Sequence, residues 1–203
     1  MSSVELTRRR TLVALATVGV GSAAAGAGTY SAFSDSGTDS GSFTAGTLNL
    51  SVGSSQTLSF SAGNIKPGDS GSSFVDLSTS GTLTGDLTVE VTGVTLTNDA
   101  GETSDNLDQH LDLQVWLDQG GTDDGTVDSG DIGLLSDGTT GSGSASFSKV
   151  ANYDATSWTD AITGMSNDWT FHVDWQFPDD GTNINNAQGD SVTVDFKFTL
   201  NQQ

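Results

Sequence analysis

The chain is short of the residues on which many enzymes and secreted proteins depend. Its 203 residues include no cysteine, two prolines, two histidines and six lysines or arginines. Without cysteine no disulfide can form, so an exported domain must be stabilised by its core, by metal ions or by partners. No His-Glu-x-x-His pair for zinc and no Gly-x-Ser-x-Gly motif for a nucleophilic serine occurs in the sequence. We therefore identify no catalytic residues, and we expect His110 and His172 to be surface residues.

Acidic residues outnumber basic residues by 26 to 6, which gives a net charge of −20. A charge of this sign and size repels nucleic acid and anionic lipid, so neither is expected as a partner. Multimolar salt screens such repulsion to within a few ångström. We interpret the charge as the surface of a protein from a salt-loving organism. An acidic disordered segment is the alternative, but the strand patterns described below argue against it for most of the chain.

The N-terminus has the basic, apolar and small-residue regions of a signal peptide, which we expect to form a helix and to be removed on export. The uncharged run after the arginines is too short and too weakly apolar for a good spanning helix, so no permanent membrane anchor is expected. The pair Arg9-Arg10 fits a twin-arginine export motif. An ordinary secretory signal with three arginines stays open.

The predicted cleavage site divides the chain into three parts. Cleavage after Ser31 would leave Ala32 as the new N-terminus, because Thr29 and Ser31 supply the small residues that a signal peptidase requires. Earlier sites are available at 23, 25 and 27. The expected parts are a signal peptide (1–31), an N-terminal segment (32–52) and a folded domain (53–203). The mature protein would carry a net charge of −22 and be secreted.

Alternation of apolar and polar residues predicts an all-β protein. The clearest runs are 169–177, 192–200, 111–117 and 87–91, and weaker strands are expected at 48–52, 58–60 and 73–77. Alternation of this kind gives one buried and one wet face, which places His172 on a wet face and Trp116 on the face opposite Val115. A short helix is expected at 154–163. The predicted fold is a β-sandwich of jelly-roll type, with turns in the Gly-, Ser-, Asp- and Asn-rich connectors.

Three short pieces of sequence carry a family resemblance. The junction 27–35 (Ala-Gly-Thr-Tyr-Ser-Ala-Phe-Ser-Asp) is followed by 42–51 (Ser-Phe-Thr-Ala-Gly-Thr-Leu-Asn-Leu-Ser) and then by 65–69 (Ile-Lys-Pro-Gly-Asp). In this order they resemble the TasA/camelysin (CalY) family of biofilm-matrix fibre proteins. On its own, 65–69 predicts only a hairpin turn. The resemblance implies a secreted protein that polymerises with copies of itself, with other matrix or cell-surface proteins as further partners.

The N-terminal segment 32–52 is the candidate assembly strand. Its start is rich in Ser, Gly and Asp, but it carries apolar anchors at Phe33, Phe43, Leu48 and Leu50. A freed segment with a few anchors can pair with the exposed strand edge of a neighbour. The resemblance implies assembly of this kind, by donor-strand exchange. Packing of the segment on the chain's own sheet is an equal alternative.

An acidic loop directly after the predicted strand 111–117 is a candidate calcium site. Carboxylates at short spacing, separated by glycines, let a loop curl round a hard cation that prefers oxygen ligands. The loop resembles calcium loops of extracellular β-sandwich repeats and departs from the EF-hand, since no glutamate closes it. A solvated acidic face is the alternative. The candidate ligands are Asp118, Asp123, Asp128 and Asp131, with Asp124 as a fifth.

Two alternatives to a filament subunit stay open. The first is a secreted metallopeptidase of the camelysin kind, because members of that family carry a peptidase label, although no residues of this chain account for one. The second is an acidic calcium-binding module of the cell surface. Filaments, metal-dependent proteolysis and an inert monomer are the three observations that would separate these functions.

Overall fold

A computed structural model describes residues 41–42, 47–51, 54–80, 83–98, 106–119, 125–179, 187 and 189–203, all within the unit Asp39–Gln203. Eleven strands and two short 3-10 helices are assigned in these residues. The strands are β1 (Thr47–Ser51), β2 (Ser54–Gly63), β3 (Ser70–Ser80), β4 (Gly85–Thr97), β5 (Asp112–Gln119), β6 (Ile132–Leu134), β7 (Thr140–Ser142), β8 (Ser148–Lys149), β9 (Ser157–Met165), β10 (Trp169–Gln176) and β11 (Ser191–Gln202). The helices are η1 (Leu107–Gln109) and η2 (Val150–Tyr153). The described part of the chain is therefore nearly all β, as the sequence predicts.

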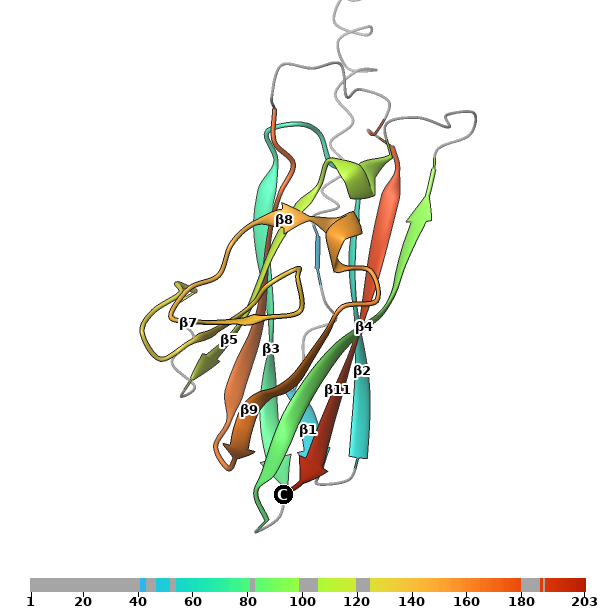
Figure 1. The fold of residues 1–203 in the computed structure, drawn as a ribbon. Coiled ribbons are helices and arrows are strands. Elements are labelled where there is room, and N and C mark those ends of the chain that lie inside the picture. Colours follow the sequence, from blue (N-terminus) through green and yellow to red (C-terminus); the bar gives the residue numbers. More distant parts are fainter. Residues whose placement is uncertain are drawn as a thin grey trace, which may run out of the picture. The chain divides into compact units, whose positions relative to one another are not determined.

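The strands form two packed sheets (Figure 1). The four-stranded sheet has the order β2-β11-β4-β9, and the seven-stranded sheet has the order β1-β3-β10-β5-β6-β7, with β8 paired to β5. Strands β2 to β5 alternate between the two sheets, β6, β7 and β8 stay in the seven-stranded sheet with β5, and β9 to β11 alternate again. Strands β10 and β11 return to lie between earlier strands. This connectivity is that of a jelly roll. Strand β1 is an addition to it, at the edge of the seven-stranded sheet.

The core lies between the sheets and follows the alternation of the sequence. Strand β11 buries every second side chain, and β10 does the same on its inner face. The ring of Phe171 meets Phe196 and Phe198 of the opposite sheet edge-on, at centroid distances of 5.0 and 4.9 Å. Aromatic pairs prefer this geometry. The alternating runs therefore join the two sheets, as the pattern predicts.

A turn at 65–69 is confirmed, but it is not a hairpin turn, because it connects β2 of the four-stranded sheet to β3 of the seven-stranded sheet. Pro67 and Gly68 take its central positions, with Gly68 at φ +93°, and the Asp69 amide donates to the Lys66 carbonyl at 3.0 Å. Phe177 exchanges backbone hydrogen bonds with Gly68 and Asp69. Burial alone would raise the pKa of Asp69, but the hydrogen bonds and charge of Lys66 lower it. The motif is thus accounted for by local structure.

The helix expected at 154–163 is wrong, because these residues belong largely to β9. The pairing of β9 with β4 skips: Val89 faces Trp158, whereas Leu87 faces Ile162. The strand therefore bulges, and Asp160 and Gly164 have positive φ angles of 53° and 67°. Bulges space the buried side chains of β9 three or four residues apart, which imitates the period of a helix.

Candidate functional site

Polar and aromatic side chains lie next to one another on the outer face of the seven-stranded sheet. Register places them in rows that run across β3, β10 and β5. The first row is Asp76, Thr170 and Asp118; the second is Phe74, His172 and Trp116; the third is Ser72, Asp174 and Gln114; the fourth is Ser70, Gln176 and Asp112. Sequence alternation predicts a wet face here, but much of it is covered.

The second row forms a ladder of rings, and it corrects the prediction that His172 is a surface residue. The His172 side chain is only 3% exposed. Its ring stacks on Trp116 at 4.7 Å and lies 5.7 Å from Phe74. Across from Trp116 stands Gly133 of β6, and a Cβ there would lie 1.9 Å from the Ser144 carbonyl oxygen. The chain at Ser144 therefore lies against this outward face at Gly133, beside Trp116.

The acidic loop begins where the first row ends. Asp118 is buried, and its Oδ2 lies 3.8 Å from His172 Nε2. Asp131 is also buried; its carboxylate accepts from the backbone amides of Gln119 (3.3 Å) and Asp128 (2.8 Å). Asp128 in turn accepts from the Gly130 amide at 2.9 Å. Asp128 and Asp131 are thus brought together, and the hydrogen bonds of Asp131 hold the loop against the end of β5.

The described residues contain no group of three His, Asp or Glu side chains that could hold a metal ion. Two of the five predicted ligands, Asp123 and Asp124, lie outside the described residues. Both Asp131 oxygens already accept backbone amides, so the loop is held closed by its own hydrogen bonds. The calcium site stays a prediction.

The N-terminal strand packs on its own sheet. β1 pairs with β3 in parallel, from Thr47 opposite Asp76 to Ser51 opposite Ser80. Leu50 is fully buried in the core, and Leu48 is partly buried against it. The Ser54 hydroxyl closes the connection to β2 by accepting from the Ser51 amide and donating to its carbonyl. The predicted anchors Leu48 and Leu50 therefore do contact the core.

Gly41 and Ser42 hold the same segment at a second point, which the sequence does not reveal. Ser42 and Ser61 of β2 exchange backbone hydrogen bonds of 2.9 and 3.3 Å, and the Gly41 carbonyl accepts from the Ser73 hydroxyl of β3 at 3.1 Å. A Cβ on Gly41 would lie 2.5 Å from the Phe60 ring and 2.8 Å from Trp175 Nε1. The segment thus bridges the two sheets at one margin of the sandwich. Only a glycine fits at this crossing.

Several predicted residues lie outside the described part of the chain. They are the export pair Arg9 and Arg10, the cleavage residues Ser31 and Ala32, and the assembly anchors Phe33 and Phe43. Among the described residues no helix is long and apolar enough to cross a membrane.

The fold defines the class of protein: a jelly-roll sandwich with an added N-terminal edge strand. The model of the family described as camelysin metallo-endopeptidase matches residues 7–203, which is nearly the whole chain. The chain therefore belongs to the camelysin family, as the resemblance indicates. No curated protein matches it significantly.

The family's description implies a metal, and the described residues do not fit a catalytic zinc site. Such a site takes three protein ligands, usually with histidines among them. His110 lies before β5, at the end of η1, whereas His172 faces Trp116, the fifth residue of that strand. His172 is also enclosed by the ring ladder. We derive no hydrolytic step from these residues.

Proposed function

We propose that the protein is a secreted structural subunit that polymerises into extracellular filaments of a biofilm matrix or cell surface. Copies join by exchange of the N-terminal strand. Membership of the camelysin family supports the extracellular location. The observation that carries the proposal is the position of β1, an edge strand whose Leu50 fills a place in the core.

Exchange of β1 between copies preserves its contacts. A neighbour's strand can pair with β3 in the same register and bury its own Leu50 in the same place, which is the logic of domain swapping. Burial of one leucine contributes about 1.5–3 kcal/mol in either arrangement. The balance between closed monomer and filament is then set by protein concentration. The candidate partner is therefore a second copy of this chain.

Electron microscopy of the secreted protein tests the proposal directly. We expect filaments from the mature protein. Deletion of residues 32–49 should leave a folded monomer, with its far-ultraviolet β-signal intact, that no longer polymerises. Fibres of normal length from the truncated protein would contradict exchange of this strand. A monomeric mature protein at high concentration would contradict the filament function itself.

A metallopeptidase is the second candidate function, and the family's description is the observation that favours it. The test is cleavage of casein by the purified protein with added zinc and with a chelator. Zinc-dependent cleavage that the chelator removes would favour the peptidase, and a His172→Ala variant would show whether the buried histidine takes part. We expect no such activity in purified filaments.

Calcium is the cofactor we propose for the acidic loop. The burial of Asp118 and Asp131 supports it, because carboxylates held out of water gain from a cation. The remaining ligands would come from Asp128 and from Asp123 and Asp124. An acidic calcium-binding surface module is the corresponding alternative function.

A further inference from the structure

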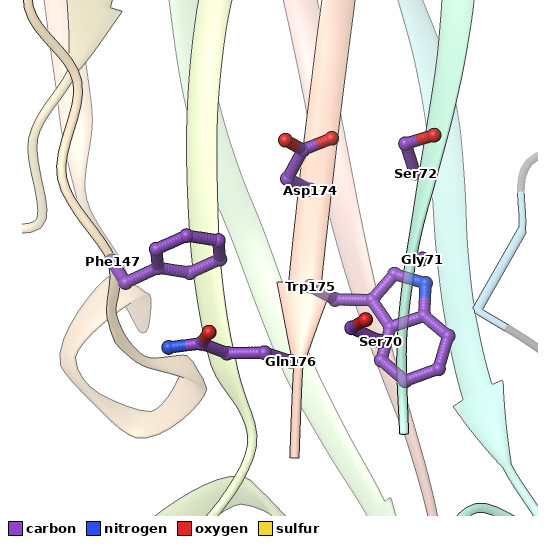
Figure 2. Close-up of a pocket in the computed structure, with 7 residues that line it drawn as sticks. All are labelled: Ser70, Gly71, Ser72, Phe147, Asp174, Trp175 and Gln176. Atoms are coloured by element: carbon purple, nitrogen blue, oxygen red, sulfur yellow. The ribbon is translucent and has the colours of Figure 1, made fainter. Parts of the chain in front are cut away.

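A shallow pocket of about 320 Å³ opens on the outer face of the seven-stranded sheet, beside the ring ladder. Ser70 and Ser72 come from β3, and Asp174 and Gln176 come from the facing strand β10. Opposite pairs share a face of the sheet, so these four polar side chains project together. Phe147, just before β8, closes the side toward β5, with Asp174 between it and Ser72 (Figure 2).

Asp174 is the charged group of this pocket, and it is half-buried. Within the part of the chain that the structure describes, its carboxylate has no hydrogen bond and no salt bridge. Burial raises its pKa. The nearby cation Lys149 is already engaged: its Nζ lies 2.8 Å from Asp112 and donates to the His110 carbonyl at 3.0 Å. The pocket therefore holds a carboxylate whose charge is not balanced locally.

The remaining polar groups of the pocket add acceptors rather than positive charge. Gln176 Nε2 donates to Asp112 Oδ2 at 3.3 Å, so its Oε1 is the atom left to accept. The hydroxyls of Ser70 and Ser72 can accept or donate. A ligand that matches this set must supply hydrogen-bond donors.

Two exposed aromatic rings border these acceptors. Among the described residues the exposed large apolar side chains are Phe74, Leu83 and Phe147. Phe74 and Phe147 both lie on this face, 49% and 41% exposed, and Phe74 neighbours Ser72 along β3. Exposed rings grouped on one face mark binding sites, and the face of a phenyl ring attracts a cation.

We propose that this pocket binds an organic cation, a protonated amine or guanidinium group. Asp174 supplies the counter-charge, Gln176 and the serines accept hydrogen bonds, and Phe147 covers the ligand with its ring. The net charge of −20 favours approach of a cation and opposes an anion. A neutral hydroxyl ligand would leave the carboxylate without a counter-ion. The site is independent of strand exchange, since β1 contributes none of its residues.

The test is a titration of the purified protein followed by amide chemical shifts in nuclear magnetic resonance spectra. The ligands are n-butylammonium, Nα-acetyl-lysine N-methylamide and its neutral analogue Nα-acetyl-norleucine N-methylamide. We expect both cations to shift the amides of Ser72, Asp174 and Gln176, and the neutral analogue to leave them unchanged. Tighter binding of the lysine derivative would assign the site to basic side chains of a protein partner. Tighter binding of butylammonium would assign it to free amines.

Three variants complete the test. Asp174→Asn removes the charge at nearly constant shape and should weaken binding about tenfold. Phe147→Leu keeps an apolar side chain but removes the ring, and it should also weaken binding about tenfold. Asp154→Asn, the same change at an exposed aspartate outside the pocket, should have no effect. Equal binding of the norleucine derivative, unchanged binding by Asp174→Asn, or no binding of either cation would overturn the proposal.

Discussion

The imidazole of His172 lies flat on the indole of Trp116, with ring centroids 4.7 Å apart and planes within 5° of parallel. The two residues face one another across β10 and β5, and both are almost fully buried although they project from the outer side of the sheet. The sandwich therefore has a second, smaller layer of packing outside its main core. This layer fixes β5, from whose end the acidic loop leaves.

We predict that Trp116→Leu lowers the free energy of unfolding by about 2–4 kcal/mol, because it removes a buried ring and leaves a void beside His172. Denaturant unfolding checks the value. Leu83→Ala, at a side chain that is 60% exposed, should change it by less than about 0.5 kcal/mol. Equal effects of the two variants would mean that the outer layer does not stabilise the fold.

Asp174 predicts a pH dependence of stability. Burial raises the pKa of its carboxyl above the ordinary value of 3.8, so the native state binds this proton more tightly than the unfolded state does. The contribution of Asp174 to stability is present below that value and is lost as pH rises through the raised native pKa. Asp174→Asn should therefore gain stability relative to the wild type as pH rises above about 4. Unfolding curves between pH 3 and 7 measure it, with Asp154→Asn as the control; parallel curves for all three proteins would contradict the prediction.

Gly41 predicts a point mutation that blocks assembly. A single methyl group there would collide with the Phe60 ring and with Trp175, whether the segment comes from the same chain or from a neighbour. Gly41→Ala should therefore reduce filament number and length in electron micrographs and lower stability by about 1–3 kcal/mol. Gly93→Ala is the matched control, since a Cβ at Gly93 meets nothing within 4 Å. Normal filaments from Gly41→Ala would show that this crossing does not form in the polymer.

The acidic loop predicts a response to calcium. Binding to the native state alone stabilises it by RT ln(1 + [L]/Kd), roughly 2.7 kcal/mol at a hundredfold excess over Kd. Millimolar calcium should therefore raise the thermal midpoint. The comparison is made at fixed ionic strength, because monovalent salt screens the repulsion between the carboxylates of the loop. The double change Asp123→Asn with Asp128→Asn should abolish the rise. An equal rise in the double variant would show that the loop is only an acidic face.

Processing at the predicted junction gives the last prediction. Mass spectrometry of the extracellular protein should find Ala32 as its N-terminus, because Thr29 and Ser31 are the small residues that cleavage requires. A start between 24 and 28 would move the site toward the earlier alanines. An intact Met1 in the extracellular product would refute cleavage.

The main strands could be predicted from the sequence because one face of each strand packs in the core and the other faces outward. Val192 to Leu200 alternates with polar residues along β11, and the structure buries that face as expected. The same reasoning fails at His172, because alternation identifies two faces but not a later segment that covers the second one. Gly133 leaves room for the chain at Ser144, but in the sequence it cannot be distinguished from a turn glycine.

The bulged strand β9 and Gly41 show two further limits of prediction from the sequence. Trp158 and Ile162 have helical spacing because β9 bulges between them, and nothing local reveals the partner strand that causes the bulge. Gly41 sits in a Ser- and Gly-rich stretch where no single glycine stands out. The spacing of carboxylates and glycines predicts the candidate ligands Asp118, Asp128 and Asp131, whereas the Asp174 pocket depends on the register between β3 and β10.

The two margins of the sandwich differ in what they offer another β-strand. On one side lie β9, whose bulges interrupt its regular spacing, and β7, which is three residues long. Both are devices that discourage pairing at a sheet edge. On the other side lie β1 and the ten-residue β2. In the filament that we propose, each copy would receive a neighbour's strand on this flank alone, which would give a line of copies and not a layer.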